Sequence, residues 1–200
     1  MSTIQPIHQY QDGLFNTASG KLINIWNPQP DTITISDIAN ALSKICRFGG
    51  HINEFYSVAQ HSILVAAMCE NDIKMEGLMH DASEAFVGDV IKPLKNIIGK
   101  SYDEVEDRFM QVIVEKFELN MASMHRVKEY DKAALEIEHR HLQLNDNKPW
   151  HMAMIAYKLP FRVLPPAEAR VEFLLAFKQY ASPALYAKIV REDSAVVGSI

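Results

Sequence analysis

The sequence predicts an all-α protein, a helical bundle with a small β-hairpin near its N-terminus. Apolar residues recur at helical spacing in several segments, and serine or proline residues that favour helix starts precede these segments. With 48% hydrophobic and 22% charged residues, the 200-residue chain can bury a substantial core. Its length fits a single domain over residues 1–200, with the core at about 35–145 and a helical extension at 146–200.

The N-terminal part contains the predicted hairpin and two helices. Apolar residues alternate over residues 15–26 around a Ser-Gly pair, which indicates two short strands joined by a turn. Ser36 is predicted to cap a helix that ends at about Phe48, where two glycines follow. Ser57 is predicted to cap the next helix, which carries His61 in its first turns.

The rest of the chain is also predicted to be mainly helical. A third helix is expected over residues 74–86, whereas residues 90–98 resemble a loop that contains proline and lysine. Ser101 and Glu104 match the capping-box pattern and should open another helix. The remaining helices are predicted over residues 123–144 and from Pro165-Pro166 through Phe177, separated by a polar break at 146–149.

Charge and composition argue against several functional classes. The net charge of −5 and the pI near 5.9 do not suit nucleic-acid binding, which needs a basic face. Cys46 and Cys69 suggest reduced thiols in a cytoplasmic protein rather than a disulfide framework. The start has no signal-peptide pattern, and the longest apolar run is too short to span a bilayer. We therefore expect no nucleic-acid or membrane partner; we also expect a homo-oligomer.

Residues 77–89, GLMHDASEAFVGD, place ionisable side chains in a segment that otherwise has an apolar core face. Burial of such groups costs several kcal/mol unless each has a partner or a metal. On one helix, His80 and Glu84 would lie roughly 40° apart and Asp81 and Glu84 roughly 60° apart. These three side chains would therefore form one polar patch, with Asp89 just beyond it.

Two other apolar helices are interrupted in the same way. His61 lies within an apolar run, and Asp131 lies beside an apolar stripe. Two imidazoles and two carboxylates from three segments would suit a divalent metal such as zinc, manganese, cobalt or iron. The pattern alone leaves open a simpler interpretation, in which the histidine is a satisfied core residue and the aspartate is solvated.

A resemblance supports the metal interpretation. His61, the His80-Asp81 pair and Asp131 resemble the H…HD…D signature of the HD-domain phosphohydrolases, and EYDKAAL gives Asp131 a matching context. Residues 80–95, HDASEAFVGDVIKPLK, are similar to a segment of bacterial 5′-deoxynucleotidases. Two segments, 35–51 and 55–62, resemble the phage dATP triphosphohydrolases, which are encoded by viruses whose DNA carries 2-aminoadenine. The likeness covers roughly residues 15–145.

This resemblance implies a role for each candidate residue. Glu84 would be the general acid toward the departing 5′-oxygen, and Asp89 would orient the attacking water. Arg47 and Lys95 would contact phosphate. Phe48 would lie against the deoxyribose, although the relatives often carry Trp there, which leaves this contact open. The metal ligands would be His61, His80, Asp81 and Asp131.

The resemblance also implies a reaction, with alternatives. The expected activity is hydrolysis of dATP to deoxyadenosine and triphosphate, with Zn, Co, Mn or Fe bound and Mg accompanying the triphosphate. A 5′-deoxynucleotidase acting on monophosphates and a non-catalytic nucleotide-binding module are the alternatives. Hydrolases of stringent-response nucleotides carry a Glu-Asp pair, but Ala85 follows Glu84 here. The Gly-Tyr-Pro motif of the cyclic-dinucleotide branch is absent from the sequence.

Several other residues are less suited to the site. His139 and His141 lie roughly 200° apart on a helix, so at most one of them reaches it. His51 remains a candidate substrate contact. Trp26 and Trp150 are expected to pack rather than to stack on a base. The residues expected at the surface are His8, His125 and His151, together with the acidic helix start of Glu104, Glu106 and Asp107.

Overall fold

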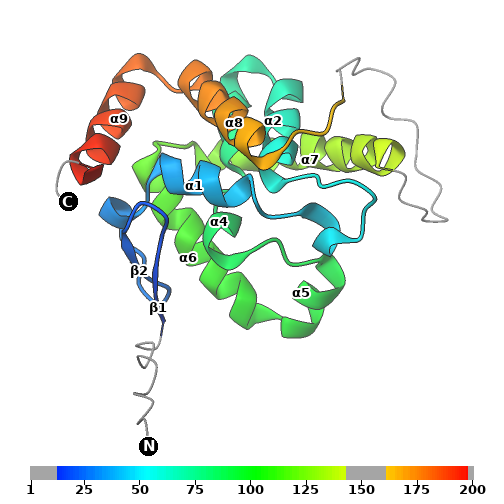
Figure 1. Cartoon of the computed structure of the whole chain (residues 1–200), viewed down its shortest axis with the longest axis horizontal. Helices are drawn as coiled ribbons and strands as arrows, with labels where there is room; N and C mark the ends of the chain where they lie inside the picture. The colour runs from blue at the N-terminus through cyan, green and yellow to red at the C-terminus, as the bar shows by residue number, and fades with distance from the viewer. Residues whose placement is uncertain (1–12, 143–160, 198–200) are drawn as a thin grey trace, which may run out of the picture.

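The computed structural model describes residues 13–142 and 161–197 and confirms the mostly helical fold with a small N-terminal hairpin (Figure 1). The hairpin pairs β1 (Leu14–Asn16) antiparallel with β2 (Leu22–Asn24), with Phe15 opposite Ile23. Its turn falls at the predicted Ser-Gly pair. Within the described ranges, no helix combines the length and the apolar surface that crossing a bilayer requires.

Helices account for most of the remaining structure. The described α-helices are α1 (Ile35–Leu42), α2 (Val58–Met68), α3 (Lys74–Met79), α4 (Glu84–Val87), α5 (Lys92–Ile98), α6 (Lys100–Lys116), α7 (Met121–His141), α8 (Pro166–Tyr180) and α9 (Pro183–Val197). Short 3₁₀ turns lie at Pro30–Thr32, Arg47–Gly50 and Asn71–Ile73.

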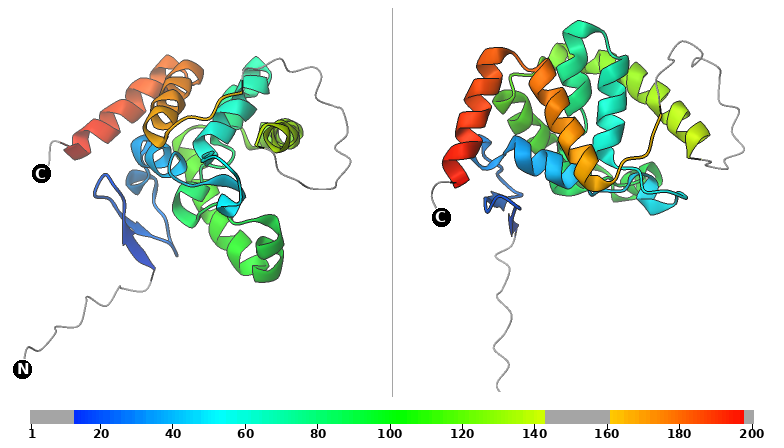
Figure 2. Two further views of the ribbon diagram at one scale, coloured as in Figure 1. Left: turned by 45° about the vertical axis from the view of Figure 1, so that its right-hand side comes forward. Right: turned by 45° about the horizontal axis from the view of Figure 1, so that its top comes forward.

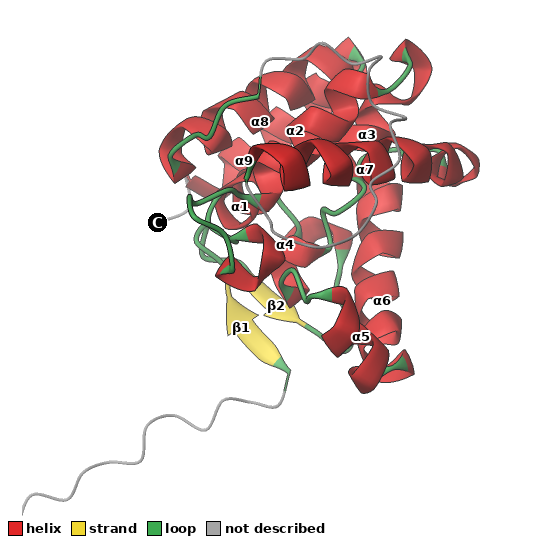
Figure 3. Ribbon diagram, turned by 90° about the vertical axis from the view of Figure 1, so that its right-hand side faces the viewer, coloured by secondary structure: helices red, strands yellow, loops and turns green. Residues whose placement is uncertain are grey.

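Helix α2 is the centre of the bundle (Figure 2, Figure 3). It packs against α3, α7 and α8, and nearly all of its residues are buried. A helix that is apolar on every side belongs in the interior, which explains why His61 on α2 is fully buried. The apolar core around it extends from Ile23 of the hairpin to Ile189 of α9.

The predicted cap of α2 is confirmed. The Ser57 hydroxyl accepts a hydrogen bond from the backbone N–H of Gln60, and the Gln60 side chain accepts one from the Ser57 N–H in return. This is a capping box, which satisfies two backbone donors at once. The Gln60 side chain also donates to the Arg162 carbonyl at 3.0 Å, so the start of α2 is tied to the segment before α8.

Replacing Ser57 by Ala should therefore destabilise the fold by about 1 kcal/mol. For a chain of this length, the melting temperature should fall by roughly 2–4 °C. Ser101→Ala is the matched control, because the structure gives α6 no side-chain cap. Thermal unfolding followed by circular dichroism compares the two variants. Equal losses in both would show that the Ser57 hydroxyl does not stabilise α2 as a cap.

Two predicted caps were wrong. Thr34, not Ser36, caps α1, and its hydroxyl accepts from the backbone N–H of Asp37. The buried Asp37 carboxylate also accepts from Ser19 in the hairpin turn, which fixes this start. The helix ends at Leu42 rather than at Phe48. In α6 the helix begins at Lys100 after a glycine, so the Ser101 and Glu104 pattern caps nothing.

Other boundaries also differ from the predictions. The helix expected over 74–86 breaks into α3 and α4, and residues 80–83 form the turn between them. Residues 90–98 are not a loop, because α5 forms with Pro93 in its first turn, where a missing N–H costs nothing. Helix α7 starts two residues before the predicted 123, and its predicted end and the break at 146–149 lie outside the described residues. Helix α9 was not anticipated.

Candidate metal centre

Three segments that are distant in the sequence bring the predicted ligands together. His61 comes from α2, His80 follows the last turn of α3, and Asp131 lies in the middle of α7. One ligand atom from each of these residues lies within 4.8 Å of the other two, which is close enough to hold one metal ion. The Asp131 side chain is 43% exposed, so the group has a side open to solvent.

Asp81 lies beside this group rather than within it. Its Oδ2 atom is 3.2 Å from Nε2 of His80 and 3.5 Å from Nε2 of His61. The same oxygen is 3.9 Å from Nη1 of Arg47. The four predicted ligands therefore meet in one place, and Asp81 joins the imidazoles to a guanidinium.

Hydrogen bonds fix the orientation of both imidazoles. Nδ1 of His61 lies 2.6 Å from Oε1 of Glu138, and Nδ1 of His80 lies 2.8 Å from the carbonyl of Gly77. Because both partners are acceptors, each Nδ1 must carry the proton and donate it. In the neutral form of each imidazole, Nε2 then has a lone pair, and both Nε2 atoms are buried.

Those lone pairs face carboxylates, which makes the site suitable for a cation. Nε2 of His61 is 3.1 Å from Oδ1 of Asp131, a contact between two acceptors that repel each other unless a proton or a metal lies between them. Two neutral imidazoles and carboxylate oxygens are ligands that zinc and related divalent metals accept. The residues therefore fit a divalent ion.

The charges around His61 also favour a cation at this site. Burial and the Arg47 charge lower the pKa of His61, but the Glu138 and Asp131 carboxylates outweigh them and raise it to about 10. Burial opposes ionisation of Asp81, yet His80, His61 and Arg47 lower the pKa of Asp81 well below its usual value. The cluster is therefore rich in carboxylate charge and attracts a positive partner, a proton or a metal, to the imidazoles.

Glu138 is a central residue that the sequence analysis missed. It is fully buried on α7, and its carboxylate binds His61 through one oxygen and Arg47 through the other. Glu138 lies seven residues after Asp131, two helical turns along the same face. That spacing could have indicated in the sequence that Glu138 faces the site. However, glutamates are common in charged helices, so Glu138 did not stand out.

Glu84 is the most unusual acid near the centre. It begins α4, is 5% exposed, and has Oε2 buried without a hydrogen-bond partner. Burial and the charges of Asp81 and Asp89 raise the pKa of Glu84 to about 9, although Lys95 at 3.6 Å and Arg47 oppose the rise. A carboxyl in this environment retains its proton at neutral pH.

Asp89 follows the turn after α4. Gly88 has a φ of 81°, and the Tyr102 hydroxyl donates to its carbonyl at 2.8 Å, so the turn is fixed from α6. Asp89 is half-buried, and burial raises the pKa of its carboxyl, against the opposing charge of Arg47. The predicted acid and the predicted water-orienting residue thus influence each other electrostatically.

The predicted phosphate contacts are not solvated surface charges. Arg47 is 9% exposed, and its guanidinium lies over the Phe48 ring, 5.2 Å from the centroid. Phe48 has a φ of 57°, an uncommon conformation for a bulky residue that often marks a functional site. Lys95 contacts Glu84 and also Glu106 at 3.0 Å, so the prediction that Glu106 is solvated was wrong.

The other candidates lie around or away from this group. His139 packs edge-on against Phe48, and His141 stacks on Phe161, so neither is in the metal group. Trp26 is 63% exposed, and the prediction that it packs was wrong. His51, His125, Glu104 and Asp107 are exposed, which confirms the surface predictions for the last three. His8, Trp150 and His151 lie outside the described residues.

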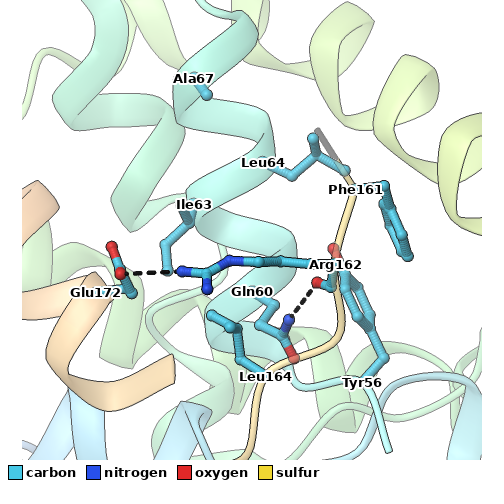
Figure 4. A pocket seen from close by; sticks show the side chains of 9 residues that line it. All are labelled: Tyr56, Gln60, Ile63, Leu64, Ala67, Phe161, Arg162, Leu164 and Glu172. Atoms are coloured by element: carbon cyan, nitrogen blue, oxygen red, sulfur yellow. Dashed lines mark hydrogen bonds and ion pairs between the residues drawn. The ribbon is translucent and has the colours of Figure 1, made fainter. Parts of the chain in front are cut away.

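A separate cavity of about 240 Å³ lies between α2 and the segment before α8 (Figure 4). Its lining is mostly apolar, with Arg162 and Glu172 paired at 3.2 Å along one side. None of the predicted site residues lines it. It is lined by Tyr56, Gln60, Ile63, Leu64, Ala67, Phe161, Arg162, Leu164 and Glu172.

Comparison with known proteins places the chain in a family. No protein-family model matches it. It is 41% identical over 134 residues to the uncharacterised protein YfdR of Escherichia coli K12, covering 67% of this chain and 75% of YfdR. It is 31% identical over 175 residues to the uncharacterised protein RCAP_rcc00048 of Rhodobacter capsulatus, covering 78% of this chain and 89% of that relative. The chain therefore belongs to the family of YfdR and RCAP_rcc00048.

Proposed function

We propose that this protein is a metal-dependent phosphohydrolase of the HD-domain type that hydrolyses deoxynucleotides at the α-phosphorus. The preferred substrate is dATP, and the products are deoxyadenosine and inorganic triphosphate. One observation carries the proposal: two buried imidazole nitrogens face carboxylates at 3.1 and 3.2 Å, close to a buried carboxyl whose pKa is raised to about 9. That combination suits hydrolysis better than it suits structural metal binding.

His61, His80 and Asp131, with Asp81 beside them, would hold the ion, which we expect to be Zn, Co, Mn or Fe. When bound, such an ion neutralises phosphoryl charge and acidifies water. A structural metal site is closed by protein ligands, whereas a catalytic one keeps a position open. The exposed side of Asp131 supports the catalytic type.

Two acidic side chains near the centre would donate a proton and orient the attacking water. Cleavage of the bond to the 5′-oxygen releases an alkoxide, which is a poor leaving group without a proton donor. Burial and neighbouring carboxylates raise the pKa of Glu84 to about 9, which favours its protonated form, so it can supply that proton. Asp89, whose turn is fixed by the Gly88 carbonyl contact, would orient the attacking water.

The substrate contacts follow from the cations around the centre. Arg47 and Lys95 would bind phosphate oxygens, and Phe48 would lie against the deoxyribose. Arg47 is held in place by carboxylates before any substrate arrives, so it loses little freedom on binding. The preference for adenine and for a triphosphate rests on the resemblance of residues 35–51 and 55–62 to the phage enzymes.

Two alternatives share this geometry. A 5′-deoxynucleotidase breaks the same bond in a monophosphate, so the metal group and Glu84 serve both reactions equally. A non-catalytic module would bind a nucleotide without turnover. The retention of the metal group together with a protonated Glu84 favours an enzyme over that module, since a binding module needs no proton donor.

Incubation of the protein with dATP, dAMP or ATP and one divalent metal, with products separated by chromatography, tests the proposal. We expect deoxyadenosine and intact triphosphate from dATP and little turnover of ATP. Glu129→Gln, a change of an exposed acid on α7, should be as active as the unmodified chain. Turnover of dAMP with dATP untouched would identify a 5′-deoxynucleotidase. Nucleotide binding without any product would identify a binding module.

A further inference from the structure

Glu138 joins His61 to Arg47 through hydrogen bonds to both of its carboxylate oxygens. Its Oε1 accepts from Nδ1 of His61 at 2.6 Å, and its Oε2 lies 3.2 Å from Nε and 3.1 Å from Nη2 of Arg47. The Tyr56 hydroxyl also hydrogen-bonds the carboxylate. These three partners come from the start of α2 and from the loop before it, so one buried charge on α7 orients several separate groups.

The two carboxylate oxygens have different consequences. The bond to His61 holds the proton on Nδ1 and leaves the Nε2 lone pair pointing at the metal position. The bond to Arg47 keeps the guanidinium from moving closer to Asp81, which lies only 3.9 Å from Nη1. Without this restraint, Arg47 would compete with the metal for the Asp81 carboxylate.

Charge balance supports the same interpretation. The carboxylates of Asp81, Asp131 and Glu138 would be balanced by Arg47 and one bound divalent ion. A fully buried carboxylate with 0% exposure is costly unless donors surround it, and Glu138 has them on both oxygens. A glutamine has the same shape but only one acceptor oxygen, so it cannot serve both donors.

We propose that Glu138 is a positioning residue that sets the tautomer of His61 for metal binding and holds Arg47 ready for the substrate phosphate. The proposal rests on the metal centre and on the phosphate role of Arg47 in the proposed function. It assigns one buried carboxylate to two tasks, so its loss should be seen in metal binding and in nucleotide binding separately.

The test begins with Co²⁺ binding to metal-free protein, measured by calorimetry and by the visible spectrum of the bound ion. Glu138→Gln should bind Co²⁺ roughly 10–100-fold more weakly, as other losses of a partner behind a metal-binding histidine do. Glu138→Asp, which keeps the charge, should recover part of this loss. Glu129→Gln removes an exposed charge from the same helix and should bind Co²⁺ as the unmodified chain does.

A second measurement examines the Arg47 side of the proposal. The affinity for dATP is measured in a Glu84→Gln background, in which turnover is suppressed, and at a Co²⁺ concentration that saturates every variant, so that weaker metal binding does not contribute. Glu138→Gln and Arg47→Ala should each weaken binding, and the double variant should bind no more weakly than Arg47→Ala alone, because Glu138 acts through Arg47. Additive losses would overturn this half of the proposal.

Other results test the proposed effect of Glu138 on metal binding. If Glu138→Gln binds Co²⁺ with unchanged affinity and spectrum, the proposal is wrong. A lower melting temperature with an unchanged Co²⁺ spectrum would assign Glu138 a merely structural role and would also overturn it. If Glu138→Gln does not fold, the Co²⁺ affinity of Glu138→Asp decides. If the unmodified chain binds Co²⁺ but hydrolyses no nucleotide, the proposed function is wrong. The Co²⁺ measurements on the Glu138 variants still test whether Glu138 orients His61 for metal binding.

Discussion

Replacing His80 or Asp131 by Ala should remove both the bound metal and the activity. Each residue supplies one of the three atoms that lie within 4.8 Å of one another, so its loss leaves too few ligands for an ion. Changes behind a ligand weaken metal affinity by roughly 10–100-fold, and loss of a ligand itself should exceed that. Elemental analysis of purified protein measures the loss of metal, and chromatographic detection of deoxyadenosine formed from dATP measures the loss of activity.

Stability gives an independent measure of the same loss. An ion present at 100 times its dissociation constant stabilises the folded state by about 2.7 kcal/mol, so a chelator should lower the melting temperature of the unmodified chain by roughly 5–11 °C. The His80 and Asp131 variants should show no such shift. His125→Ala, at an exposed position on α7, should retain it. A variant that kept stoichiometric metal would remove its residue from the centre.

The sequence could predict that the candidate metal ligands come together, because each of them interrupts or adjoins an apolar segment. His61, His80 and Asp131 each place an ionisable group in or beside an apolar segment, which is costly unless something compensates. The structure brings the ligand atoms of all three together, as that reasoning expected. Their roles in a reaction stay a prediction.

The break between α3 and α4 could not be predicted from local helix propensity, because α3 also packs closely on α2. Gly77 lets α3 approach α2 so closely that an added Cβ would lie 2.7 Å from Sγ of Cys69 and 3.1 Å from Cα of Ala66. His80 then donates back to the Gly77 carbonyl from the end of the helix. Residues 74–86 are locally compatible with one continuous helix, and tertiary packing overrides that preference.

Glu138 was missed for a related reason. Its partners His61 and Arg47 are 77 and 91 residues away in the sequence, and nothing near Glu138 reveals them. In the sequence, the burial of α7 on this side is visible only as a weak apolar stripe that includes Ala134 and lies beside Asp131. Periodicity therefore locates ligands that interrupt apolar helices, but not the carboxylate behind them.

Replacing Glu84 by Gln should slow turnover by roughly 10²–10⁴-fold, the usual contribution of a general acid, while metal and nucleotide binding are retained. The amide keeps the shape of the buried side chain but cannot give up a proton to the 5′-oxygen. Glu104→Gln, at an exposed position on α6, is the matched control and should be fully active. Nitrophenyl phosphates, whose leaving group needs no proton, should be affected far less.

The pH dependence should identify Glu84 as the acid. Burial and neighbouring carboxylates raise its pKa to about 9, so the required protonated form is present below this value and is lost as the pH rises. A bound cation favours the carboxylate and shifts the decline in kcat to a lower pH. The residual activity of Glu84→Gln should show no such decline. If the decline persists in that variant, or if nitrophenyl substrates are slowed as much as nucleotides, another residue supplies the proton.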